Sequence, residues 1–266
     1  MTTLDLVARE TFARCAPFYD CLTAHHDYED VADMVEELLH RHGRPGRRML
    51  DLACGTGKSF LPFARRGYEV TASDISPEML ELARAKVNGS TELIEADMRS
   101  LPHLGEFDFV TCLDEPINYL LEPVEVERTF ASVARNLRSG GLFLFDLNTL
   151  HLFRTSLARD ECYEQEGWLF VWRGHGSDST APGGCSGFTI EAFSKRPEGG
   201  WTRLSNQHLQ RHYPADEVPA LLARAGLEHV CVYGIAPDGT LDPRPDEQRH
   251  MKLFHVARKP TRSPRR

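Results

Sequence analysis

The residues best suited to chemistry lie in segment 49–59, which reads MLDLACGTGKS. An apolar run there leads into two glycines and then into a helical pattern, so we expect a strand that turns sharply into a helix. Glycines in such a turn let a ligand approach the backbone where a Cβ would clash. Several nucleoside-containing ligands bind at turns of this kind, and the exact spacing must separate them.

Two phosphate-binding patterns do not fit this segment. The P-loop pattern G-x-x-x-x-G-K-[ST] matches at 57–59 but needs a glycine where Leu52 stands. The dinucleotide pattern G-x-G-x-x-G would begin at Gly55 and needs its third glycine where Phe60 stands. Asp51 would also repel a pyrophosphate. The segment therefore favours a cationic ligand without phosphate, whose ammonium group Asp51 could attract.

Acidic residues follow two further strand-like segments. Asp74 ends the first and could accept hydrogen bonds from both hydroxyls of a ribose, while Ile75 and Met79 could pack on an adenine ring. Asp97 ends the second and could accept the adenine amino group, with Met98 offering its backbone N–H. Each acid taken singly could instead cap a helix or turn. Together they would meet at the sheet edge where ligands bind.

These segments resemble the class I S-adenosylmethionine-dependent methyltransferases, over about 47–150 and more loosely over 215–260. Segment 107–114 resembles the fourth-strand motif of that family, and 137–141 resembles the turn before its fifth strand. The resemblance implies S-adenosyl-L-methionine as cofactor and S-adenosyl-L-homocysteine as product. It implies contacts to the cofactor from Tyr19, Asp51, Ala53, Gly55, Gly57, Asp74, Ile75, Met79, Asp97, Met98, Cys112 and Leu113.

The segment after 107–113 is expected to border the acceptor of the methyl group. Its acids would suit a cationic amine and could take up its proton, although they could equally cap the following turn. A hydroxyl acceptor would need a base, for which histidines near the end of an inserted segment, 151–213, are candidates. The expected catalytic residues are Tyr19, Asp114, His208 and His212. The expected acceptor contacts are Glu115, Asn118, Tyr119 and Trp168.

The inserted segment and the stretch from Tyr19 to Tyr28 resemble a small-molecule N-methylating branch of the family, which includes sugar-amine and glycine-type enzymes. The resemblance implies methyl transfer to an amine, or to a hydroxyl, of a small polar metabolite. A peptide or protein N-methyltransferase and a protein that binds the cofactor without transferring its methyl group stay open as alternatives.

The elements that must position these residues alternate between strand and helix from 48 to 146, which predicts a doubly wound, mostly parallel, Rossmann-like α/β sheet. Strand patterns at 168–174, 188–194 and 201–213 predict an inserted antiparallel β lid, or a homodimer contact. The expected units are a helical cap at 1–43, a cofactor-binding domain at 44–150 and 214–260, an inserted sheet at 151–213 and a disordered tail at 261–266.

Composition narrows the class of protein. The chain has 266 residues and a net charge of −8, which disfavours nucleic acid as a partner. It has no apolar run near the roughly 20 residues of a membrane span and no signal-peptide core at its start, so we expect a cytoplasmic protein without a membrane partner. Seven cysteines without a C-x-x-C pair, and histidines without metal-ligand spacing, predict neither disulfides nor a metal site.

Overall fold

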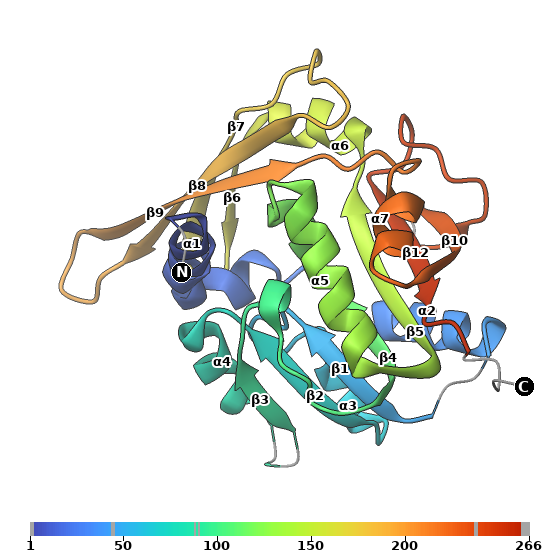
Figure 1. The fold of residues 1–266 in the computed structure, drawn as a ribbon. Helices are drawn as coiled ribbons and strands as arrows, with labels where there is room; N and C mark the ends of the chain where they lie inside the picture. Colours follow the sequence, from blue (N-terminus) through green and yellow to red (C-terminus); the bar gives the residue numbers. More distant parts are fainter. Residues whose placement is uncertain (1–2, 44–45, 88, 90, 237–238, 262–266) are drawn as a thin grey trace, which may run out of the picture.

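An eight-stranded sheet runs through the centre of the computed structural model, which describes residues 3–43, 46–87, 89, 91–236 and 239–261 (Figure 1). Its order is β11-β10-β12-β5-β4-β1-β2-β3. The strands are β1 (Arg48–Leu52), β2 (Glu69–Asp74), β3 (Glu92–Glu95), β4 (Phe107–Cys112), β5 (Leu137–Asn148), β10 (Glu228–Ile235), β11 (Leu241–Asp242) and β12 (Lys252–Arg258). Strands β1 to β5 pair in parallel, whereas β12 lies antiparallel between β5 and β10. The predicted doubly wound, mostly parallel α/β sheet is confirmed.

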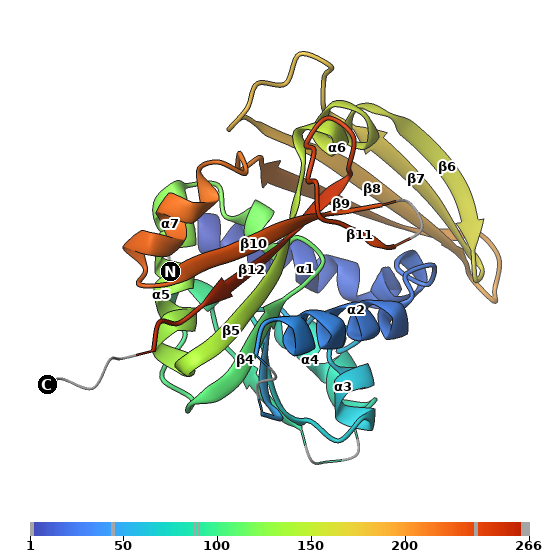
Figure 2. The same ribbon diagram turned by 90° about the vertical axis from the view of Figure 1, so that its right-hand side faces the viewer.

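Helices cover both faces of this sheet (Figure 2). Successive side chains of a strand point to opposite faces, so Leu50 packs with α5 and α7 while Met49 packs with α2, α3 and α4. These helices are α2 (Tyr28–Arg41), α3 (Leu61–Arg65), α4 (Pro77–Arg84), α5 (Pro123–Asn136) and α7 (Val218–Arg224). Short helices η1 (Met98–Ser100), η2 (Pro116–Tyr119), α6 (Leu150–Arg154) and η3 (Ser156–Ala158) join the other elements.

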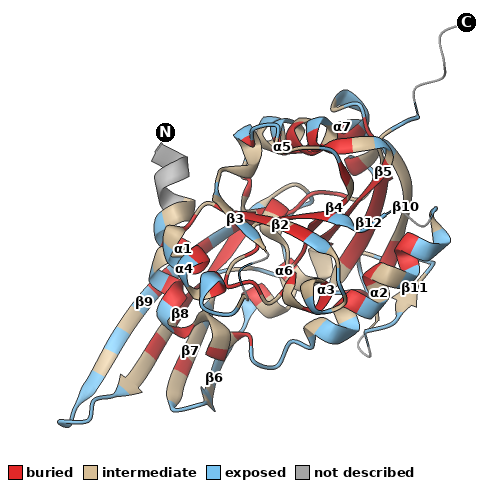
Figure 3. Ribbon diagram, turned by 90° about the horizontal axis from the view of Figure 1, so that it is seen from below, coloured by how far each residue is buried: buried red, intermediate tan, exposed pale blue. Residues whose placement is uncertain are grey.

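A separate four-stranded antiparallel sheet, which we call the lid sheet, follows β5 in the chain. It consists of β6 (Asp160–Gln165), β7 (Trp168–Gly174), β8 (Cys185–Lys195) and β9 (Trp201–Arg211). Strand β7 has the predicted limits, and β6 was not predicted because its residues are polar and mostly exposed. Figure 3 shows that the central strands are largely buried, whereas the far end of the lid sheet is exposed.

The N-terminal helical pattern divides into two helices that pack in different places. Helix α1 (Thr3–Leu22) lies under the lid sheet, where Phe18 packs with Phe170. Asp27 then caps α2, which packs on the central sheet. Among the described residues, no helix combines the length and apolar character that a membrane span requires. Of the predicted disordered tail, residues 262–266 lie outside the described residues.

Candidate functional site

A cavity of about 890 Å³ lies between the carboxyl ends of the central strands, helix α1 and the inner face of the lid sheet. The residues that follow β1, β2, β3 and β4 all reach it, as expected for the edge at which ligands bind in this architecture. The predicted residues that line it are Tyr19, Ala53, Gly55, Asp74, Ile75, Asp97, Met98, Leu113, Asp114, Glu115, Tyr119 and His208.

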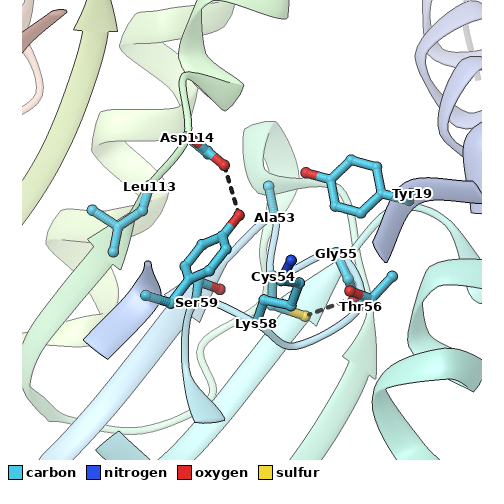
Figure 4. A pocket seen from close by; sticks show the side chains of 10 residues that line it. Tyr19, Ala53, Cys54, Gly55, Thr56, Lys58, Ser59, Leu113 and Asp114 are labelled. Atoms are coloured by element: carbon cyan, nitrogen blue, oxygen red, sulfur yellow. Dashed lines mark hydrogen bonds between the residues drawn. The ribbon is translucent and has the colours of Figure 1, made fainter. Parts of the chain in front are cut away.

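The glycine-rich turn forms one wall of the cavity, with Tyr19 of α1 and Asp114 close by (Figure 4). Ala53 and Gly55 both have a φ of 53°, in the left-handed region. Asp74 holds the turn because its Oδ2 accepts the Gly55 N–H at 2.8 Å and its Oδ1 accepts the Ser76 N–H at 2.9 Å. The acid at the tip of β2 therefore shapes the turn that follows β1.

Four predicted cofactor residues are absent from the cavity lining, and three of them pack behind the turn and the strands. Gly57 has a φ of 89°, and a Cβ on it would lie 3.0 Å from the Phe60 ring, so this glycine permits close packing under the turn. Met79 is fully buried in the cluster that α1 forms with the lid sheet, and Cys112 of β4 is fully buried in the core that the central sheet forms with α5 and α7. These three residues support the site from behind.

Asp51 also lies behind the turn instead of facing the cavity. Its carboxylate is fully buried and accepts hydrogen bonds from Ser59 Oγ at 2.6 Å and Thr111 Oγ1 at 2.5 Å. Burial raises the pKa of Asp51 to about 6, even though both hydroxyl groups favour the ionised form. Asp51 ties β1 to β4 and to the start of the next helix, which fixes the backbone that the ligand would meet.

The acidic turn after β4 has an unusual backbone. Asp114 and Glu115 have φ angles of 70° and 56°, a region that non-glycine residues rarely adopt. The Asp146 carboxylate at the end of β5 accepts both of their N–H groups, at 2.7 and 3.2 Å, and so holds this conformation. The sequence analysis missed Asp146, although it is an acid near the end of a predicted strand, like Asp74.

Lys252 of β12 enters this group of acids. Its Nζ lies 2.8 Å from Asp114 Oδ1 and 3.2 Å from Asp146 Oδ2, and it also pairs with Glu115. The sequence analysis missed Lys252 because nothing local marks it: it lies near the end of the chain and reaches the site only through the order of the strands.

The two neighbouring acids differ in their tendency to hold a proton. Burial opposes ionisation of Asp114, but Lys252 and His26 outweigh it and hold its pKa well below the usual range. Its Oδ2 also accepts hydrogen bonds from Tyr28 Oη at 2.7 Å and from His26 Nδ1 at 3.2 Å. The pKa of Glu115 is raised by burial and by the neighbouring carboxylates, and Lys252 offsets this rise only in part. Glu115 is therefore the better proton acceptor of the two.

His208 lies on the lid side of the cavity and pairs with Tyr119. The distance from Tyr119 Oη to His208 Nδ1 is 2.9 Å, and Asn206 Nδ2 lies 3.1 Å from His208 Nε2. Burial lowers the pKa of His208 to about 3. The ring is neutral at physiological pH and is a weak base, which argues against the predicted role.

Two further predicted residues serve structural connections. Asn118 donates to the Arg211 carbonyl at 2.8 Å and accepts the Asn148 N–H at 2.9 Å, which joins the acidic turn to β5 and β9. Trp168 of the lid sheet packs against Phe18 of α1 and is absent from the cavity lining. Trp172 of the same strand lines the cavity instead.

His212 is likewise buried away from the cavity. Its Nδ1 accepts the Gly183 N–H at 3.2 Å, so Nε2 carries the proton that it shares with Glu247 at 3.1 Å. Both ring nitrogens are used to hold the chain where it leaves the lid sheet, and the structure leaves neither free to act as a base.

The chain is similar to proteins named as methyltransferases. Residues 49–141 match a family model described as a methyltransferase domain. A protein of Geobacillus sp. (strain WCH70) named as a methyltransferase is 30% identical and covers 94% of this chain and 100% of its own length. YqeM of Bacillus subtilis (strain 168), also named as a methyltransferase, is 32% identical over 92% of this chain and 95% of its own.

Solved structures share the fold over almost the whole chain. An S-adenosylmethionine-dependent methyltransferase from Clostridium acetobutylicum ATCC 824 has a TM-score of 0.77 at 22% identity, covering 91% of this chain and 96% of its own. The sugar N-methyltransferase KedS8 from Streptoalloteichus sp ATCC 53650 has a TM-score of 0.70 at 23% identity and covers 91% of both chains. With its glycine turn, its strand-tip acids and relatives that cover more than nine-tenths of its length, the chain belongs to the S-adenosylmethionine-dependent methyltransferases.

Proposed function

We propose that the protein transfers the methyl group of S-adenosylmethionine to an amine of a small molecule. One observation carries this proposal: a single cavity joins the glycine turn and Asp74 to the acidic pair Asp114 and Glu115. Helix α1 and the lid sheet also line this cavity, which suits a small acceptor better than an extended peptide. A solved structure of this fold is named as a sugar N-methyltransferase, which is consistent with a small amine.

The polar groups of the cavity suit the parts of the cofactor. Asp74 would hold the ribose, because its carboxylate is fixed by backbone N–H groups and lines the cavity as a hydrogen-bond acceptor. Asp97 and Met98 would border the adenine, and Arg99 fixes the Asp97 carboxylate through Nε–oxygen distances of 3.0 Å. Tyr19 and the Ala53 turn would border the methionine part. The sulfonium supplies the reactive methyl group, so the protein has to position the acceptor and exclude water.

The acids explain the preference for an amine. An amine that is protonated in solution must lose a proton before its nitrogen can attack. Glu115 faces the cavity and has a raised pKa, so it would accept this proton, while Asp114 stays ionised and attracts the cation. A hydroxyl acceptor would need a stronger base, and His208 is too weak. The geometry therefore favours N-methylation.

Removal of the strand-tip acids should weaken cofactor binding. We expect Asp74→Ala and Asp97→Ala each to lose a charge-assisted hydrogen bond to the nucleoside, about 1.5–3 kcal/mol, or roughly 10- to 150-fold in Kd. Isothermal titration with S-adenosylhomocysteine measures this change. Asp33→Ala, at an exposed acid of α2, is the control and should bind as the wild type does. Wild-type affinity in both test variants would refute this placement of the cofactor.

A further inference from the structure

Five ring side chains gather on the acceptor side of the cavity. We call them the ring wall: Phe12, Tyr119, Trp172, Phe188 and His208, all of which line the cavity. The centroids of Trp172 and Phe188 are 3.7 Å apart with the rings 15° from parallel, and those of Phe188 and His208 are 4.5 Å apart at 10°. Tyr119 meets both Phe12 and His208 edge-on, at 5.1 and 5.8 Å.

The lid sheet places the three stacked rings by its register. Phe188 of β8 lies directly opposite His208 of β9, and Trp172 of β7 lies opposite Ile190. Because side chains alternate along a strand, all four residues share the inner face of the sheet. The three stacked rings of the wall are therefore fixed on paired strands and by one another.

Next to the ring wall, the acceptor space is acidic. Three carboxylates, of Asp114, Glu115 and Asp146, face a single lysine, Lys252, together with His26, whose pKa its hydrogen bond with Asp114 raises. By formal charge the three carboxylates outnumber the lysine, so the cluster would attract a cation. Glu115 directly precedes the short helix η2, and Tyr119 ends that helix. The acids and the ring wall are therefore neighbours.

We infer that the acceptor is an amine carried on a flat aromatic ring, an arylalkylamine in chemical class. This inference rests on the proposed function, and it differs from a sugar amine. The edges and free faces of stacked rings favour an aromatic partner, edge-on or offset. Phe12 and Phe188 carry no hydrogen-bonding group, so the hydroxyl groups of a sugar directed at them would lose water without gaining a partner. The acids would hold the ammonium group at the other end.

Binding of matched amines tests the inference. Tryptamine, 2-phenylethylamine, 2-cyclohexylethylamine and D-glucosamine are titrated by calorimetry into the protein loaded with S-adenosylhomocysteine. We expect the two aryl amines to bind at least tenfold more tightly than glucosamine. The affinity of 2-cyclohexylethylamine should lie between that of the aryl amines and that of glucosamine. Glucosamine binding equal to or tighter than tryptamine binding, or no measurable binding of either aryl amine, would overturn the inference.

Variants of the lid sheet show whether the ring wall makes the contact. Trp172→Ala should weaken tryptamine binding about tenfold, and Trp172→Phe should restore most of it because a flat ring returns. Trp201→Ala, at an exposed tryptophan of the same sheet, is the matched control and should bind tryptamine as the wild type does. The affinity for S-adenosylhomocysteine is measured in every variant to detect general unfolding. Equal tryptamine binding by Trp172→Ala and wild type would count against the wall.

Product formation separates this inference from the proposed function. The same amines are incubated with S-adenosylmethionine, and release of S-adenosylhomocysteine is measured. Methylation of glucosamine without methylation of the aryl amines overturns the inference and leaves the proposed function standing. Tight binding of aryl amines without any release overturns the proposed function and leaves the aromatic site standing.

Discussion

The two glycines of the cofactor turn have different reasons to be glycine. Both have positive φ angles, but their surroundings differ. A Cβ at Gly55 would meet only the Tyr19 ring, at 3.8 Å, and would point into space that a ligand would use. A Cβ at Gly57 would press on Phe60 at 3.0 Å, in the packed interior. One position serves binding and the other serves packing.

Alanine at each position should separate these roles. Gly57→Ala should destabilise the fold by about 1–2 kcal/mol from backbone strain, with the contact to Phe60 adding to this. Gly55→Ala should carry only the backbone cost but should weaken S-adenosylhomocysteine binding more than tenfold. Thermal unfolding and calorimetry on the two variants measure both effects. A larger loss of affinity in Gly57→Ala than in Gly55→Ala would contradict the assignment.

Sequence reasoning found residues that act near their own strand and missed those that act across the molecule. The acids Asp74 and Asp97 follow apolar runs, so their place at the sheet edge could be predicted. Lys252 meets Asp114 only because β12 inserts beside β5, and no local pattern contains that pairing. Asp51 was predicted at the right edge, but its orientation depends on the hydroxyls of Ser59 and Thr111.

At the scale of elements, helix α1 is fastened to the cofactor turn. Asp20 of α1 accepts a hydrogen bond from Thr56 Oγ1 at 2.5 Å and pairs with Lys86 Nζ at 2.5 Å. Lys58 Nζ also donates to the Thr23 carbonyl at 2.7 Å. We therefore expect these contacts to loosen when cofactor and product exchange.

Loss of this fastening should speed product release. Asp20→Ala removes two partly exposed contacts, each worth about 0.2–1 kcal/mol, so we expect S-adenosylhomocysteine to dissociate roughly two to thirty times faster. Stopped-flow fluorescence measures the rate, and hydrogen exchange over residues 15–25 should increase. Glu10→Ala, which removes an ion pair within α1 itself, is the control. An unchanged dissociation rate in Asp20→Ala would show that α1 does not control exchange.

The prediction of elements succeeded where periodicity was strong. Strand β7 was predicted at its observed limits because aromatic residues alternate along it. Strand β6 was missed because its side chains are polar on both faces, so that only pairing with β7 makes it a strand. The pattern at 1–43 resembled one helical unit, yet the break before Asp27 sends α1 to the lid sheet and α2 to the central sheet.

For the whole molecule, Lys252 is a half-buried cation that partly neutralises the acids at the end of the central sheet. Lys252→Met should cost about 3–5 kcal/mol near pH 7.5, because it leaves Asp114, Glu115 and Asp146 without their counter-ion. Their pKa values in the folded variant would then lie above the unfolded values, so the folded state binds more protons and the deficit should shrink as the pH falls toward 5.

Urea denaturation at pH 7.5 and pH 5 measures this deficit. In the wild type the pKa of Asp114 lies below its ordinary value, so its stabilising contribution is kept over this range and is lost only at lower pH. Lys259→Met, at a lysine that donates to the Leu137 carbonyl, is the control and should show no such pH dependence. A deficit of equal size at both pH values would contradict the charge argument.

The position of β12 has a consequence for biosynthesis. This strand lies inside the central sheet, between β5 and β10, although it is translated after both of them. A nascent chain that ends before residue 252 therefore carries the three carboxylates without their ammonium partner and exposes two unpaired strand edges. Domains tend to fold from the N-terminus during translation. In ribosome-bound intermediates of this protein, the acidic side of the pocket should therefore form only after β12 has been synthesised and has inserted between β5 and β10.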